Sequence, residues 1–123
     1  MAIRLLALDL DGTVLSDEER VSTRVRAVLE RARQRGIHVT LASGRGFPSL
    51  RHWAGELGVT APLICYQGAM VVDPQSEQVL YRSTFPLSLA AEAVDFARAR
   101  GLSLTLYVDD VIYVEKMLHS DEF

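Results

Sequence analysis

Over the first half of the chain, apolar segments with strand character alternate with segments of helical spacing. The segments that predict strands are residues 3–10, 37–42 and 62–66. A helix is predicted after a cap at Ser22 or Thr23, and a second one from about Pro48 to Gly58. This alternation predicts a parallel sheet with right-handed crossovers, so we expect an α/β fold with a Rossmann-like core. Because residues 3–10 are almost continuously apolar, they further predict a strand buried on both faces.

The pattern changes after the third strand. A hairpin is predicted for residues 69–82, with its turn at residues 74–77. After a linker, the sequence predicts a helix from Leu89 to Arg100 and a second hairpin over residues 102–115 that turns at Asp109-Asp110. We therefore expect two domains: residues 1–83, which hold the parallel sheet and the first hairpin, and residues 84–123, of α+β character.

Charge and composition exclude several classes of function. The 123 residues carry a net charge of −3, so no overall positive field recruits nucleic acid or an anionic membrane. No apolar run approaches the roughly 20 residues that span a bilayer, and the first ten residues lack a signal-peptide pattern. The single cysteine, Cys65, agrees with a reducing compartment. We expect a cytoplasmic protein that binds neither nucleic acid nor membranes.

Polar residues follow each of the three predicted core strands. Asp9 and Asp11 come at the end of the first strand, Ser43 after the second, and Gln67 with Gly68 after the third. Ligands of open parallel sheets bind beyond the carboxyl ends of the strands. The three turns are therefore expected to meet at one edge of the sheet and to form the functional site there.

Two carboxylates at positions i and i+2 suit covalent phosphoryl transfer. One of them, Asp9, would attack phosphorus, and the other, Asp11, would protonate the leaving oxygen and then activate water. Two like charges so close favour a cation, and carboxylate oxygens suit Mg²⁺. Gly12 allows backbone N–H groups to approach a phosphate, and Thr13 adds a hydroxyl donor. The alternative is an ordinary turn at the end of a strand, although an unpaired Asp9 inside an apolar strand would be costly.

A second phosphate-binding turn is predicted at Ser43-Gly44-Arg45. Ser43 would present a hydroxyl, Gly44 would give backbone access, and Arg45 would pair with a phosphate or another anionic group of the substrate. The alternative for this turn is an ordinary strand-to-helix connection with a capping serine.

Taken together, these motifs resemble those of the haloacid dehalogenase superfamily. Asp9-Leu10-Asp11-Gly12-Thr13 resembles its first motif and Ser43 its second. The form Ala42-Ser43-Gly44-Arg45 is similar to that of the Cof-like branch of phosphatases. Tyr66-Gln67-Gly68-Ala69 resembles the Asn-Gly-Ala turn of that branch, with Gln67 where Asn is usual. The resemblance extends over nearly the whole chain.

The resemblance implies Mg²⁺-dependent hydrolysis of a small phosphorylated metabolite through an aspartyl phosphate. It makes Asp9 the nucleophile and a metal ligand, and Asp11 the acid/base, whose backbone carbonyl also faces the metal. It gives phosphate or substrate binding to the residues Gly12, Thr13, Ser43, Gly44, Arg45 and Gln67. The segment from Leu87 onward would begin a substrate-selecting cap. A phosphotransferase would use the same chemistry and differ only in the acceptor.

Two later motifs of this family, a Lys and an acidic pair that completes the metal site, have no clear match. Asp109-Asp110 is better explained as a hairpin turn, and Lys116 as an exposed residue. We therefore expect a truncated chain; a natively short form that oligomerises is the less favoured interpretation. The rival function is a catalytically incomplete fragment, or an interaction module that binds phosphate without turnover.

Overall fold

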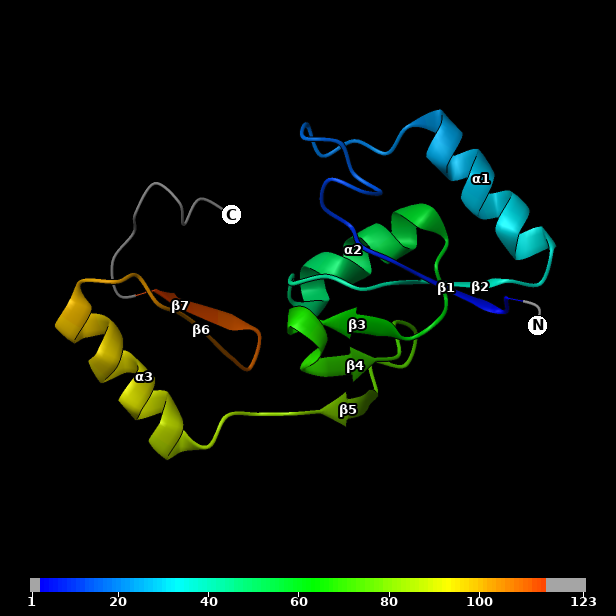
Figure 1. Cartoon of the computed structure of the whole chain (residues 1–123). Coiled ribbons are helices and arrows are strands. Elements are labelled where there is room, and N and C mark those ends of the chain that lie inside the picture. The colour runs from blue at the N-terminus through cyan, green and yellow to red at the C-terminus, as the bar shows by residue number, and fades with distance from the viewer. Residues whose placement is uncertain (1–2, 115–123) are drawn as a thin grey trace. The chain divides into compact units, whose positions relative to one another are not determined.

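The first two strands, β1 (Leu5–Leu8) and β2 (His38–Leu41), pair in parallel, and α1 (Thr23–Gln34) connects them. The structure is a computed structural model that describes residues 3–114 (Figure 1). Internal contacts divide the chain into two compact units, Met1–Ser83 and Thr84–Phe123. The predicted α/β class with a parallel pair is confirmed; the identification of the units as core and cap stays a prediction.

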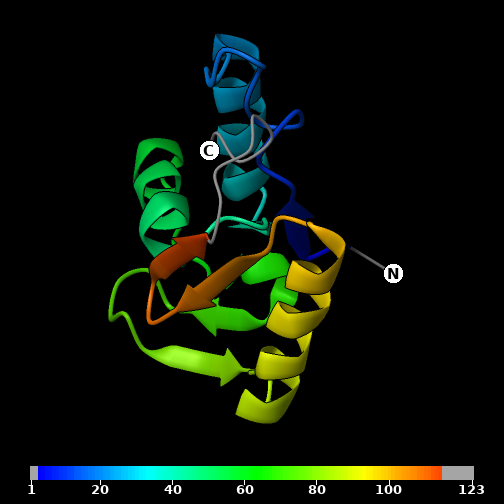
Figure 2. The same ribbon diagram turned by 90° about the vertical axis from the view of Figure 1, so that its left-hand side faces the viewer.

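The third strand, β3 (Leu63–Cys65), lies beside β2. A parallel bridge joins Ala42 to Ile64, directly after β2 ends. Beyond β3 the pairing becomes antiparallel, through β4 (Met70–Val72) and β5 (Val79–Arg82). The first predicted hairpin is therefore present, and Figure 2 shows it from a second side.

Local capping explains where the helices begin and end. The Ser22 hydroxyl accepts a hydrogen bond from the Val25 N–H at 3.2 Å and starts α1. Pro48 lies in the first turn of α2 (Phe47–Leu57), and Gly58 ends this helix in the left-handed conformation at φ 63°. Such signals are local in the sequence, which is why both helices could be predicted.

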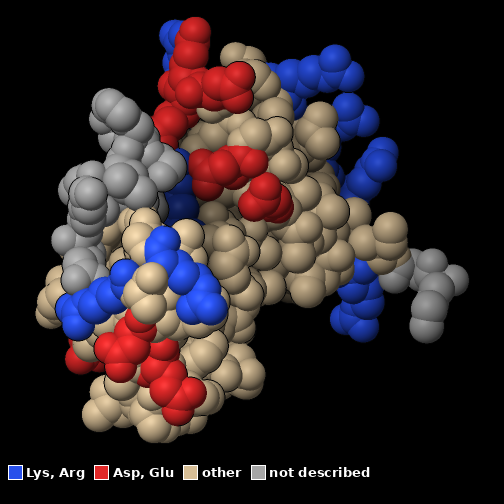
Figure 3. Space-filling view, turned by 60° about the vertical axis from the view of Figure 1, so that its left-hand side comes forward, with Lys and Arg blue, Asp and Glu red and all other residues tan. Residues whose placement is uncertain are grey.

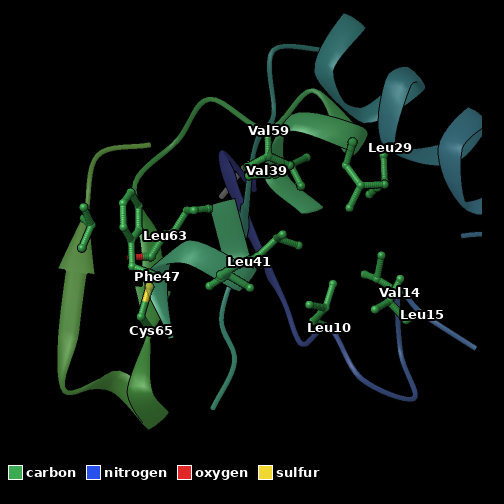
Figure 4. Packing of buried hydrophobic residues seen from close by; sticks show 14 of the residues in the cluster. Leu10, Val14, Leu15, Leu29, Val39, Leu41, Phe47, Val59, Leu63 and Cys65 are labelled. Atoms are coloured by element: carbon green, nitrogen blue, oxygen red, sulfur yellow. Dashed lines mark hydrogen bonds between the residues drawn. The ribbon is translucent and has the colours of Figure 1, made fainter. Parts of the chain in front are cut away.

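The core of the first unit gathers apolar side chains from the strands, from both helices and from the turn that follows β1 (Figure 4). Leu10, Leu41 and Leu63, which come from three different segments, have no exposed surface. At about 25 cal/mol per Å² of buried apolar surface, such burial is the main favourable contribution to folding. The ends of β1, β2 and β3 are thereby fixed to one another.

The predicted burial of the first strand on both faces is wrong. β1 is shorter than residues 3–10, and the Leu5 side chain is 56% exposed. Among the described residues β1 pairs only with β2, so its other edge has no neighbouring strand. Apolar content alone did not reveal this, because it does not report how many strands flank a segment.

The second unit consists of α3 (Leu87–Arg100) and a hairpin of β6 (Thr105–Val108) with β7 (Val111–Val114). Asp109 and Asp110 form its turn with φ of 47° and 63°, as expected for a tight hairpin. The predicted end of this hairpin at residue 115 lies outside the described residues. No helix in the described part of the chain is long and apolar enough to cross a membrane.

Leu41→Ala should lower the free energy of unfolding by about 2–5 kcal/mol, because it leaves a cavity where three chain segments meet. Urea denaturation followed by circular dichroism measures this change. Leu80, on β5, is 51% exposed, so the matched Leu80→Ala variant should change stability by less than about 0.5 kcal/mol. Equal effects of the two variants would contradict this location of the core.

Candidate active site

The turn after β1 is organised around the carbonyl of Leu10. This oxygen accepts hydrogen bonds from the N–H groups of Thr13, Val14 and Leu15, at 3.5, 3.0 and 2.8 Å. The side chains of Leu10, Val14 and Leu15 are buried in the core. The residues before and between them are exposed at the surface: Asp9, Asp11, Gly12 and Thr13. Burial of these apolar side chains therefore leaves the other four residues of the first motif at the surface.

Asp9 follows β1 directly and is exposed. Within residues 3–114, its carboxylate makes no hydrogen bond or ion pair with the protein. Asp9 is therefore not the buried, unpaired carboxylate that its apolar neighbours in the sequence indicated. An exposed carboxylate without protein partners is instead available to an incoming phosphorus atom or a cation.

The turn after β2 lies between the ends of β1 and β3. The Ala42 N–H donates to the Leu8 carbonyl at 2.8 Å, and the Ser43 N–H donates to the Ile64 carbonyl at 3.0 Å. The Ser43 side chain is buried, and its hydroxyl accepts from the Arg45 N–H at 3.2 Å. Ser43 is thus held in place by its own backbone and by the turn it begins.

The turn after β3, η1 (Tyr66–Gly68), is bonded to the Ser43 turn. The Tyr66 N–H donates to the Arg45 carbonyl at 3.1 Å, and the Gln67 N–H donates to the Ser43 carbonyl at 3.2 Å. Together with the bond from Ala42 to β1, these contacts confirm that the three strand ends meet at one edge of the sheet. The roles given to the individual side chains stay predictions.

Two consecutive residues of η1, Tyr66 and Gln67, adopt left-handed conformations with φ of 52° and 55°. Each costs about 1 kcal/mol or more for a residue with a side chain, and such strain is concentrated at functional sites. Here it places the Gln67 amide over Gly44, since a Cβ added to Gly44 would lie 2.4 Å from Gln67 Nε2. The sequence marked Gln67 but gave no signal for this paired conformation.

Arg45 makes the strongest polar contacts at the site. Its Nε donates to both carboxylate oxygens of Asp11, at 3.2 and 3.0 Å, and its Nη2 donates to Oδ1 of Asp11 at 2.7 Å. Nη2 also donates to Glu19, and Nη1 donates to the Ser49 hydroxyl at 3.3 Å. The bonds to Asp11, followed by those to Glu19, raise the pKa of Arg45 above its ordinary value. Sequence reasoning missed Glu19, which lies in an acidic stretch with no motif of its own.

The residues present fit a Mg²⁺ ion only in part. Asp9 offers open carboxylate oxygens, the ligands that Mg²⁺ prefers. The carboxylate of Asp11, in contrast, is engaged by Arg45. Among residues 3–114, no group of three or more Asp, Glu, His or Cys side chains is arranged to hold a metal. Asp109 and Asp110 lie in the second unit, and Lys116 lies outside the described residues.

The negative charge of the protein is unevenly distributed. Figure 3 shows acidic side chains close together in the upper half of the view. At the site itself, the guanidinium of Arg45 pairs with Asp11 and Glu19, and the exposed Asp9 adds a third carboxylate without a described partner. A phosphate bound here would need additional positive charge, which a cation supplies.

Two surface hollows of the first unit lie away from this edge. One, between α1 and α2, is lined by ion-paired side chains such as Arg26 and Glu56. Another is lined by Gly36, His38 and Thr60, where β2 begins, whereas Ser43 follows the end of that strand. Neither of these two hollows is lined by a residue of the candidate site.

Comparison with known proteins agrees with these motifs. A family model described as haloacid dehalogenase-like hydrolase matches residues 6–123. A 5-amino-6-(5-phospho-D-ribitylamino)uracil phosphatase of Bacillus subtilis is 30% identical over 112 residues, which are 89% of this chain and 42% of that protein. A pyridoxal phosphate phosphatase of Escherichia coli is 28% identical over 94% of this chain and 42% of its own length. The chain thus spans well under half the length of these curated relatives.

The solved structures similar to this chain share its fold. A haloacid dehalogenase-like hydrolase from Bacteroides thetaiotaomicron superimposes with a TM-score of 0.78 and 29% identity, over 97% of this chain and 46% of that one. A haloacid dehalogenase-like hydrolase from B. subtilis has a TM-score of 0.83 at 24% identity, over 96% of this chain and 41% of the other. The second likeness supports the fold alone.

Gly44→Ala should displace the Gln67 side chain, because the new methyl group would lie within 2.4 Å of Nε2. The change is measured as a shift of the Gln67 side-chain amide signals in ¹H–¹⁵N NMR spectra. Gly55, within α2, has nothing within 4 Å of an added Cβ. Gly55→Ala should therefore leave these signals in place and raise the free energy of unfolding by about 0.5–1 kcal/mol. Unchanged Gln67 signals in Gly44→Ala would contradict the packing described here.

Proposed function

The chain belongs to the haloacid dehalogenase-like hydrolases, and from this premise we propose that it carries the nucleophile and the phosphate-binding edge of a Mg²⁺-dependent phosphatase. The observation that carries the proposal is the exposed Asp9 carboxylate, without a described partner, at the edge where the turns of Ser43 and Gln67 are bonded together. The proposed substrates are small phosphate monoesters.

The proposed reaction proceeds in two steps. In the first, an oxygen of Asp9 attacks phosphorus, the bond from phosphorus to the ester oxygen breaks, and Asp11 gives that oxygen a proton. In the second, Asp11 takes a proton from a water that attacks phosphorus, and the bond to Asp9 breaks to release inorganic phosphate. Ser43 and the N–H groups near Gly12, Thr13 and Gly44 would bind the phosphoryl oxygens.

Asp9 and the backbone of Asp11 would hold Mg²⁺, which would supply positive charge against the repulsion between carboxylates and phosphate dianion. The substrate class is supported by the relatives, which are named as phosphatases of a phosphoribitylamino-uracil and of pyridoxal phosphate.

A second candidate is a chain that binds phosphate without turnover. It is favoured by one observation: no third metal-ligating side chain joins Asp9 and Asp11 among the described residues. The two candidates differ in whether the phosphoryl group is transferred after it is bound.

Asp9→Asn should abolish Mg²⁺-dependent release of phosphate from an aryl phosphate, with a loss of about 10³-fold or more, because the amide cannot form the acyl phosphate. The assay compares this variant with wild type in the presence of Mg²⁺ and of a chelator. Inorganic phosphate binding, followed by ³¹P NMR, is measured on the same samples. Binding without turnover in wild type would favour the second candidate, and neither binding nor turnover would contradict both.

Ser43→Ala should weaken the binding of inorganic phosphate by about five- to tenfold, since it removes one hydroxyl donor worth about 1 kcal/mol. Isothermal titration calorimetry measures the affinity. Ser83 lies at the end of β5 with an exposed side chain, so Ser83→Ala serves as the matched control and should bind as wild type does. An undiminished affinity for phosphate in Ser43→Ala would show that the Ser43 hydroxyl does not bind the phosphate.

A further inference from the structure

We propose that Glu19 is a positioning residue, which holds Arg45 so that the guanidinium fixes the orientation of the Asp11 carboxylate. This inference rests on the proposed function and deepens it. It assigns a role to a loop that no motif marks, and it makes Asp11, rather than the phosphate, the group that Arg45 serves.

The contacts of Arg45 define one orientation of its side chain. The Nε edge and Nη2 face Asp11 in a two-pronged arrangement. Nη2 also donates to Glu19, and Nη1 donates to Ser49. A guanidinium is planar and rigid, so groups that bind its other donors determine the direction in which it presents the Nε edge.

Burial distinguishes this arrangement from an ordinary surface ion pair. The Arg45 side chain is only 27% exposed, although the Asp11 and Glu19 side chains are 51% and 62% exposed. The cation is thus the most enclosed member of the group, and it joins two segments that are 34 and 26 residues away from it in sequence. Holding one cation between two carboxylates restrains both of the loops that carry them.

The loop of Glu19 is built to bring this side chain to Arg45. The Glu19 N–H donates to the Ser16 carbonyl at 2.9 Å, and the Ser16 N–H donates to the Arg20 carbonyl at 3.1 Å, which closes a tight turn. Within that turn Glu19 itself adopts φ 50°, a conformation that favours glycine. A glutamate at such a position is explained if its side chain is needed, and its contact with Arg45 is the use that the structure shows.

The neighbouring Glu18 provides a matched control. It lies in the same turn and carries the same charge, but it pairs with Arg20 rather than with Arg45. Glu18→Gln and Glu19→Gln therefore make the same change of charge one residue apart, and only the second removes a negative charge that Arg45 contacts.

The deciding experiment follows the NMR signal of the Arg45 Nε–H group in the 123-residue chain. This signal is assigned because it is absent from the spectrum of Arg45→Lys. In wild type and in Glu18→Gln we expect a distinct signal at neutral pH, because the Nε–H is hydrogen-bonded to Asp11 and protected from exchange. In Glu19→Gln the signal should broaden or disappear. An unchanged signal in Glu19→Gln, or an equal loss in Glu18→Gln, would overturn the proposal.

Turnover gives a second readout that separates this proposal from the proposed function. If Asp11 protonates the leaving oxygen, its misorientation in Glu19→Gln should slow the hydrolysis of phenyl phosphate by about tenfold or more, with KM unchanged. The hydrolysis of 4-nitrophenyl phosphate should slow far less, because 4-nitrophenolate is a good leaving group that does not need the proton, whereas phenolate is a poor one. Equal losses on both substrates in Glu19→Gln would contradict positioning. Absence of turnover in wild type counts against the proposed function of this chain, and the NMR signal still decides the role of Glu19.

Discussion

The burial of Leu10 is the constraint on which the candidate site depends. Its side chain is fully enclosed in the core, and its carbonyl accepts three successive backbone N–H groups. Because the buried Leu10 side chain fixes the path of the chain on both sides of it, the flanking residues Asp9 and Asp11 lie at the surface. The site is thus a consequence of packing: the residues that bear the chemistry are placed by neighbours that do not take part in it.

The negative charge at this edge accounts for the position of the Arg45 guanidinium and is a reason to expect a metal ion as well. Three carboxylates, of Asp9, Asp11 and Glu19, against one guanidinium leave a local charge of −2 before any phosphate arrives. Arg45 relieves the repulsion between the two loops that carry Asp11 and Glu19, but it makes no described contact with Asp9. A phosphate dianion at Asp9 would therefore meet an uncompensated carboxylate, which is the physical reason to expect a divalent cation there.

The sequence predicted those features that are determined by nearby residues. The ends of α1 and α2 follow from Ser22 and Gly58, and both hairpins follow from their turn residues. The meeting of the three strand ends followed from parallel topology. The exposure of β1 depended on which strands flank it, and the contact of Glu19 with Arg45 depended on a loop whose course is set by tertiary packing. Neither has a local signal in the sequence, nor do the left-handed conformations of Tyr66 and Gln67.

The described contacts that join the turns at the candidate site lie between Leu8 and Gln67. They consist of backbone hydrogen bonds between turns and of one cation shared by two carboxylates. Metal binding is different, because the described carboxylates complete no cluster of three ligands. Preorganised binding of a phosphoryl group and its transfer therefore place separate demands on the protein. The turns that the core of this unit holds in place would serve the first demand, and the second would depend on a cation at Asp9.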